Sequence, residues 1–205
     1  MAPRPRKYQR PLGTRRQKVL FLISVEGAVT EQQYFNMFND QSSIIQIECI
    51  SNKYRNSPKD VLSEIKKKLT KTDLRKEDEA WLVVDKDQWT DEQLNALYKW
   101  SEEKPNYYFA LSNPNFEYWL LLHFEDLSGH KTAKVCKERL NKHLGDYNKR
   151  ISCGQFTEER ISLAVKRAEQ QDCPQCKDWP KNTGTTVYRL INNIYEAKAK
   201  HRNGY

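Results

Sequence analysis

Three acidic side chains follow two strongly apolar segments of the chain, and their types and spacing suit catalysis. Glu26 comes directly after the apolar run at residues 19–25, and Asp85 and Asp87 follow the run at residues 80–84. Continuous apolar runs of this length are typical of strands in a parallel sheet that helices cover. Functional residues of such sheets collect at the carboxyl ends of neighbouring strands, so we expect these acids to lie close together.

Carboxylates gathered at one edge of a sheet suit a hard divalent cation. Mg²⁺ takes oxygen ligands, is held by a few carboxylates and keeps several waters for a substrate phosphate, and Mn²⁺ accepts similar ligands. We therefore predict that Glu26, Asp85 and Asp87 bind Mg²⁺ or Mn²⁺. A calcium-binding helix-loop-helix starting at Asp85 is excluded, because its loop would need Gly at position 90 and Glu at 96, where the chain has Thr and Ala. The alternative is that these acids occupy turns and helix caps.

The segment at residues 112–124 contains two further candidates. Glu117 is either a fourth acid of the site, contributing to a second metal, or a carboxylate that the dipole of a new helix favours. His123 shares a helix face with the aromatic residues Phe116 and Trp119, which favours a hydrogen-bonded core histidine over a catalytic base. Lys86, between the two aspartates, either contacts phosphate or extends into solvent.

Alternating strand and helix patterns position these residues. The fold expected is α/β, a parallel sheet flanked by helices with a C-terminal helical cap. Four helices have recognisable starts, at Thr30 with Gln33, at Ser57 followed by Pro58, at Thr90 and at Thr157. Asn113-Pro114 is expected to start another. The predicted strands are residues 19–25, 44–50, 79–85 and 107–111, and the predicted helices are residues 30–39, 58–69, 90–103, 114–124, 132–144, 157–171 and 185–202.

The excess positive charge lies in an N-terminal tail. The 205 residues carry a formal charge of +8, and residues 1–18 contain seven basic residues and no acid. The remaining 28 basic and 27 acidic residues leave a net charge of +1. We divide the chain into a flexible tail (1–17), an α/β core (18–126) and a helical region packed on it (127–205). The tail either binds a nucleic-acid backbone or is a solvated leader; its candidate contacts are Arg4, Arg6, Lys7, Arg10, Arg15 and Arg16.

Cysteine usage and hydropathy predict a cytoplasmic protein. Five cysteines at irregular spacing do not form a disulfide framework. No apolar stretch approaches the roughly 20 residues that span a membrane, and no signal-peptide apolar region follows the basic N-terminus. Cys173 and Cys176 have the spacing of half a zinc site, but the other candidate ligands are scattered, so zinc is not expected.

Three segments in this order resemble a known family. They are residues 26–35 (Glu-Gly-Ala-Val-Thr-Glu-Gln-Gln-Tyr-Phe), residues 85–87 (Asp-Lys-Asp) and residues 112–124 (Ser-Asn-Pro-Asn-Phe-Glu-Tyr-Trp-Leu-Leu-Leu-His-Phe), with residues 182–186 fitting less firmly. The order of a strand with Glu-Gly and a later strand with Asp-x-Asp resembles Toprim domains. More specifically, residues 18–200 resemble the RloB family, which is associated with restriction loci and phage-abortive systems.

The resemblance implies a Toprim-like fold and metal-dependent phosphoryl chemistry on nucleic acid. It implies that Glu26 acts as general acid/base or shares in metal binding, and that Asp85 and Asp87 bind Mg²⁺. Hydrolysis is favoured over strand passage or synthesis, since no tyrosine can be assigned a topoisomerase role and primase domains are not recognised. The resemblance also implies a partner ATPase encoded nearby. The chain has no Gly-x-x-x-x-Gly-Lys phosphate-binding loop, so any ATP use would come from that partner.

Two alternatives remain open at this stage. The chain could be a non-catalytic module that binds nucleic acid or a partner, with the basic tail as its contact surface. It could also be a nucleotide phosphohydrolase, because the acidic centre requires only a phosphate ester. The choice between DNA and RNA, including tRNA, does not follow from these residues.

Overall fold

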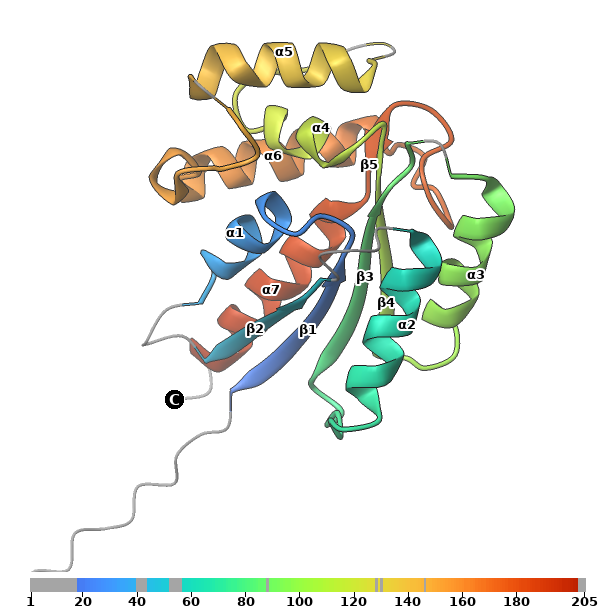
Figure 1. Cartoon of the computed structure of the whole chain (residues 1–205). Helices are drawn as coiled ribbons and strands as arrows, with labels where there is room; N and C mark the ends of the chain where they lie inside the picture. Colours follow the sequence, from blue (N-terminus) through green and yellow to red (C-terminus); the bar gives the residue numbers. More distant parts are fainter. Residues whose placement is uncertain are drawn as a thin grey trace, which may run out of the picture.

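The computed structural model describes residues 18–39, 44–51, 57–87, 89–127, 129, 131–145 and 147–202 (Figure 1). The predicted contacts of the basic tail, residues 1–17, lie outside this part of the chain. Strands and helices alternate up to α4, and helices predominate afterwards. The elements are β1 (Val19–Val25), α1 (Thr30–Asn36), β2 (Ile45–Ile50), α2 (Pro58–Leu69), β3 (Glu79–Asp85), α3 (Asp91–Ser101), β4 (Tyr107–Asn113), α4 (Phe116–Leu121), α5 (Ala133–Leu144), a short 3-10 turn (Cys153–Gln155), α6 (Glu158–Gln171), β5 (Gly184–Thr185) and α7 (Val187–Arg202).

One five-stranded sheet organises the molecule, in the order β2-β1-β3-β4-β5. The first four strands are parallel, as predicted, and β5 pairs antiparallel with the end of β4. The fold is therefore α/β, with a mostly parallel sheet. Strand β5 was not predicted, because two residues are too few to form an alternating pattern. Within β5, Thr185 lies opposite Ser112 at the carboxyl end of β4, and their hydroxyls are 2.8 Å apart.

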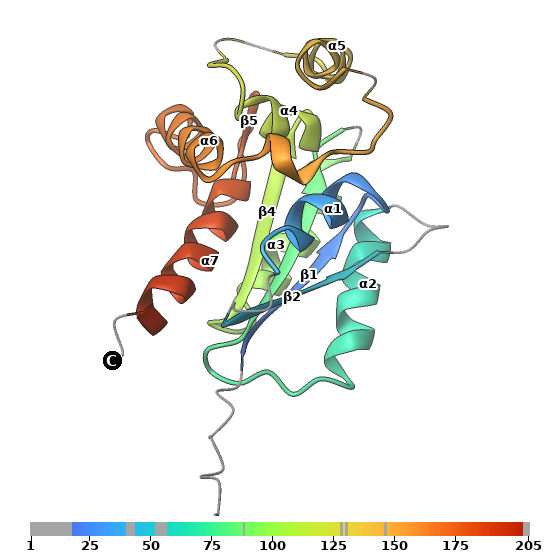
Figure 2. The same ribbon diagram turned by 90° about the vertical axis from the view of Figure 1, so that its left-hand side faces the viewer.

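Helices cover both faces of the sheet. Figures 1 and 2 show α2 and α3 on one face, α1 and α7 on the other, and α4, α5 and α6 beyond the carboxyl ends of the strands. Successive strand residues point to opposite faces, so β3 contributes Trp81 and Val83 to one apolar core and Leu82 and Val84 to the other. The first core also contains buried residues of α5, α6 and α7, so these three helices share one hydrophobic core with the sheet.

Local signals placed most helix starts correctly. Ser57 and Thr90 each cap a helix with a reciprocal capping box, and Thr157 accepts a hydrogen bond from the backbone N–H of Arg160 at the start of α6. The prediction for Thr30 was wrong. The N-cap is Val29, and the Thr30 hydroxyl donates to the carbonyl of Lys149 at 2.8 Å, since a distant segment competes for it.

Three predicted boundaries need correction. Helix α1 ends at Asn36 rather than at residue 39. Strand β4 continues to Asn113, so α4 begins at Phe116 and not at Pro114. The last helix starts at Val187, because residues 184–185 extend the sheet. Among the described residues, no helix is both long enough and apolar enough to cross a membrane.

Candidate functional site

Glu26 and Asp85 meet at the carboxyl ends of two adjacent strands. Strands β1 and β3 are parallel neighbours, with Val25 opposite Val83. The carboxylate of Glu26 accepts hydrogen bonds from the backbone N–H of Asp85 and from the indole N–H of Trp89, both at 3.2 Å. The parallel sheet therefore places these two predicted acids side by side.

Two helix starts add two more carboxylates. Glu31 lies in the first turn of α1 and is buried, with 7% of its surface exposed. Glu117 lies in the first turn of α4 and accepts a hydrogen bond at 3.1 Å from the hydroxyl of Tyr147. Glu31 and Glu117 both repel Asp85 electrostatically and thereby raise its pKa. We refer to Glu26, Glu31, Asp85 and Glu117 as the acidic cluster.

Glu31 is the member of the cluster that sequence reasoning did not single out. It stands in the Glu-Gly-Ala-Val-Thr-Glu segment, five residues after Glu26. A glutamate directly after a helix-capping threonine is common in the first turn of a helix, so its type and position alone do not distinguish it. Its burial, which distinguishes it, depends on distant parts of the chain.

The absence of a side chain at Gly27 leaves room for the Glu31 carboxylate. The backbone N–H of Gly27 donates to Glu31 Oε1 at 3.2 Å. A Cβ at Gly27 would lie 2.1 Å from Glu31 Oε2 and 2.3 Å from Oε1, far inside van der Waals contact. The glycine is therefore required for space, and it lets β1 deliver Glu26 while α1 brings Glu31 close to the same edge.

Burial and mutual repulsion raise the pKa values of Glu26, Glu31 and Asp85. Burial is the largest cause in each case. The pKa of Glu26 is raised to about 7, with hydrogen bonds from Asp85 and Trp89 opposing the effect and with Glu31 and Asp87 adding to it. The pKa of Glu31 is also raised to about 7, with Glu117 adding to burial. The pKa of Asp85 lies well above its ordinary value, because Glu31, Glu26 and Glu117 surround it.

This environment favours a bound cation or retained protons. Carboxylates that repel one another in a partly buried site are stabilised when either a proton or a metal ion neutralises them. The donor set consists of oxygens alone, which is the preference of Mg²⁺ and Mn²⁺.

The carboxylates are not arranged as a closed metal site. Within the described ranges, no group of three His, Cys, Asp or Glu side chains is placed to hold a metal ion. Glu26, Glu31 and Glu117 each accept hydrogen bonds from protein groups. Each carboxylate keeps lone pairs beyond these bonds, and the chemistry of the donors fits a hard cation.

Asp87 and Lys86 lie on the turn that follows β3. The backbone N–H of Asp87 donates to the carbonyl of Pro114 at 3.0 Å, and Asp87 is exposed with a positive φ of 30°. The amino group of Lys86 donates to the carbonyl of Trp89 at 2.6 Å and to Asp91 at 2.8 Å. Asp87 is thus close enough for its charge to act on Glu26, and the Lys86 ammonium is already paired with Asp91.

His123 belongs to the core, as the helix face predicted. It is 1% exposed, its Nδ1 lies 3.0 Å from the carbonyl of Trp119, and its Nε2 lies 2.9 Å from the hydroxyl of Tyr34. Burial lowers its pKa to about 3. The ring is therefore neutral at physiological pH, with Nδ1–H donating to carbonyl oxygen and Nε2 accepting from tyrosine.

The two cysteines of the loop after α6 have different surroundings. Cys173 is exposed, whereas Cys176 is half-buried, and its sulfur lies 3.4 Å from Nη2 of Arg189. The same arginine forms an ion pair with Asp172 at 2.8 Å. These contacts fix the loop against α7.

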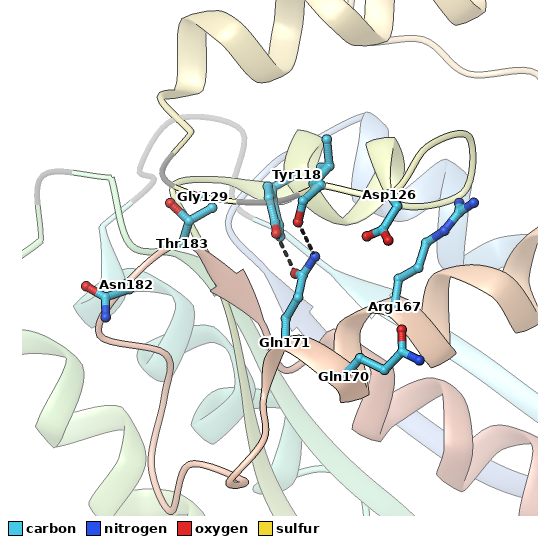
Figure 3. A pocket seen from close by; sticks show the side chains of 9 residues that line it. Tyr118, Asp126, Gly129, Arg167, Gln170, Gln171, Asn182 and Thr183 are labelled. Carbon is cyan, nitrogen blue, oxygen red and sulfur yellow. Dashed lines mark hydrogen bonds between the residues drawn. The ribbon is translucent and has the colours of Figure 1, made fainter.

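A polar cavity of about 510 Å³ lies between α4 and α6 (Figure 3). In Figure 3, Tyr118 of α4 points toward Gln171 of α6, and its hydroxyl donates to Gln171 Oε1 at 2.5 Å. Arg167 of α6, together with Asn182 and Thr183 ahead of β5, completes much of the lining. No member of the acidic cluster lines this cavity, so it is distinct from the candidate site.

A family model described as RloB-like protein matches residues 21–194, which is most of the chain. The protein therefore belongs to the RloB-like family. The searches of curated proteins and of solved structures found no match.

Proposed function

We propose that this protein is a metal-dependent nuclease that hydrolyses phosphodiester bonds of DNA or RNA, with tRNA among the candidates. The observation that carries the proposal is the acidic cluster: four carboxylates from two strands and two helices, with burial and repulsion raising the pKa values of three of them. Membership of the RloB-like family supports it, as does the resemblance of the strand-Glu and strand-Asp-x-Asp order to Toprim domains.

Different residues of the site would bind the metal and transfer the proton. Asp85 and Glu31, with Asp87 or Glu117 completing the set, would hold Mg²⁺ or Mn²⁺. The cation would neutralise the scissile phosphate and lower the pKa of an attacking water. Glu26, with a pKa of about 7, can accept or donate a proton near neutral pH and suits the role of general acid/base. Its hydrogen bond from Trp89 orients the carboxylate.

We also propose a biological setting. The family resemblance supports an antiphage role in the cytoplasm, with an ATPase partner that restrains or triggers cleavage. No phosphate-binding loop is present in the sequence, so ATP use would come from that partner.

The test is cleavage of a mixed panel of duplex DNA, single-stranded DNA, total tRNA and ribosomal RNA in Mg²⁺ and Mn²⁺. Wild type is compared with Glu26→Gln and Asp85→Asn, with EDTA as the metal control. We expect cutting that requires the metal and that both substitutions remove. Cutting that survives in both variants would contradict the assignment.

The main rival is a non-catalytic nucleic-acid-binding module, which the seven basic residues of positions 1–18 favour. It predicts binding without cutting, unaffected by Asp85→Asn and removed by deleting residues 1–17. A nucleotide phosphohydrolase predicts phosphate release from mononucleotides that both substitutions abolish, with the nucleic-acid panel intact.

A further inference from the structure

An acidic cluster that handles phosphodiesters needs positive charge to receive an anionic substrate. Its four carboxylates repel phosphate, and the Lys86 ammonium is paired with Asp91. Lys149 provides another cation. It is exposed, and no ion pair involves it among the residues that the structure describes. Its charge acts on Glu31, whose pKa it lowers against the larger effect of burial.

Lys149 lies in a segment that is fixed across the acidic cluster. We call residues 147–151, which connect α5 to the short 3-10 turn, the strap. The hydroxyl of Tyr147 bonds Glu117 at 3.1 Å and lies 3.3 Å from the hydroxyl of Thr30. Thr30 in turn donates to the carbonyl of Lys149 at 2.8 Å. The strap is thus tied to α1 and α4, the helices that present Glu31 and Glu117.

The end of the strap is anchored as well. The backbone N–H of Ile151 donates to Gln33 Oε1 at 3.0 Å. Gln33 stands on α1, two residues after Glu31, so this bond and the one from Thr30 hold Lys149 between them. These contacts join residues more than 100 positions apart, and they fix the backbone of an otherwise exposed lysine at the site.

The backbone of Lys149 is held in an unfavourable conformation. In the part of the chain that the structure describes, two residues other than glycine have a positive φ, Lys149 at 57° and Asp87 at 30°. Such conformations are costly for side chains other than glycine and cluster at functional sites. Both residues adjoin the acidic cluster, one on the turn after β3 and one on the strap.

We propose that Lys149 contacts a phosphate of the bound nucleic acid, so that the strap supplies positive charge beside the acidic cluster. The inference rests on the proposed function and adds a substrate-binding residue to it. The ammonium would pair with a non-bridging phosphate oxygen and would offset the repulsion between the substrate and the four carboxylates. Thr30, Gln33 and Tyr147 are then positioning residues, which act through the strap backbone.

The test uses four variants of the full chain. Lys149→Ala and Lys149→Gly remove the ammonium, and the glycine also relieves the positive φ. Lys149→Arg keeps the charge. Lys142→Ala removes an exposed lysine of α5 and is the matched control. Fluorescence anisotropy in Ca²⁺ measures binding of a labelled DNA duplex and a labelled tRNA transcript over a range of salt concentrations, and single-turnover cleavage in Mg²⁺ measures activity.

We expect Lys149→Ala and Lys149→Gly to weaken binding and to reduce the slope of log affinity against log salt by about 0.7–0.9, the loss of one phosphate contact. The cleavage rates of these two variants should fall to a similar extent. Both variants lack the ammonium but only the glycine relieves the positive φ, so a shared loss reports the missing charge. Lys149→Arg should retain most of the binding, and Lys142→Ala should match wild type.

The failures of the two proposals are distinguishable. If wild type cleaves and the alanine and glycine variants bind and cleave normally, the inference is overturned and the nuclease proposal stands. If wild type binds without cleaving anything, a salt slope reduced in the Lys149 variants supports the contact while hydrolysis is rejected, and an unchanged slope overturns both. If wild type neither binds nor cleaves, both proposals fail.

Discussion

At the scale of single residues, the absence of a side chain at Gly27 is as important as the carboxylates around it. An added Cβ would lie 2.1 Å from Glu31 Oε2, so any larger residue must displace that carboxylate. The displaced group is the flexible end of a side chain, which can move without unfolding the strand. The effect of substitution should therefore fall on the acidic cluster more than on stability.

We expect Gly27→Ala to weaken Mn²⁺ binding by about 10- to 100-fold, the range for displaced supporting contacts at metal sites. Isothermal titration calorimetry with Mn²⁺ measures the affinity, and urea unfolding shows whether the fold is retained. Gly154→Ala is the matched control, because nothing lies within 4 Å of an added Cβ there. Equal Mn²⁺ affinity in wild type and Gly27→Ala would show that Glu31 is not a ligand.

The raised pKa of Glu31 predicts a pH-dependent loss of stability without metal. In the unfolded chain this carboxyl ionises near 4.5, whereas in the folded protein its pKa is about 7. As pH rises from 4.5 to 7, the unfolded state loses a proton that the folded state retains, so the free energy of unfolding falls. Replacing the acid by glutamine removes this contribution and leaves an oxygen that can accept from Gly27.

We expect Glu31→Gln to gain on the order of 3 kcal/mol relative to wild type between pH 4 and pH 8 in EDTA. Urea unfolding at both pH values measures the difference, and Glu103→Gln, at an exposed position outside the cluster, is the control. Added Mg²⁺ should reduce the gain by neutralising the wild-type cluster. A constant difference between the two pH values would mean that Glu31 ionises in the folded protein as it does in the unfolded chain.

At the scale of elements, the short strand β5 attaches the C-terminal helix α7 to the carboxyl end of β4. The backbone N–H of Leu111 donates to the hydroxyl of Thr186 at 3.0 Å, and the N–H of Thr186 donates to the carbonyl of Leu111 at 2.9 Å. Both residues are fully buried. The Thr186 hydroxyl thus accepts a hydrogen bond from the backbone of β4 next to the two residue pairs that join β4 and β5.

Thr186→Val keeps the shape and leaves the N–H of Leu111 buried without its partner. We expect a loss of about 1–3 kcal/mol in the free energy of unfolding, the cost of an unsatisfied buried donor. Chemical denaturation measures it, with Thr70→Val at an exposed position as the control. Equal losses in the two variants would show that the bond to Leu111 contributes nothing specific.

Elements with a repeating pattern were predictable from the sequence, and tertiary contacts were not. The four parallel strands and the capped starts of α2 and α3 follow from short-range signals, and so does the meeting of Glu26 with Asp85 at neighbouring strand ends. The contacts of Thr30 and Gln33 with the strap join residues more than 100 positions apart, and Glu117, which repels Glu31, is also distant along the chain. No local pattern indicates such contacts, and β5 is too short to produce one.

At the scale of the whole molecule, most of the net positive charge and the acidic cluster lie in different parts of the chain. Positions 19–205 carry a net charge of +1, and the six basic residues of positions 1–17 supply most of the remainder. We expect deletion of residues 1–17 to weaken nucleic-acid binding and to lower its salt slope by at most about 5, since each phosphate contact contributes about 0.7–0.9. Anisotropy against salt concentration measures this, and single-turnover cleavage at saturating protein should be unchanged, because the acidic cluster is intact. A truncated protein with the full salt slope would show that the tail does not contact nucleic acid and that the folded body supplies the phosphate contacts.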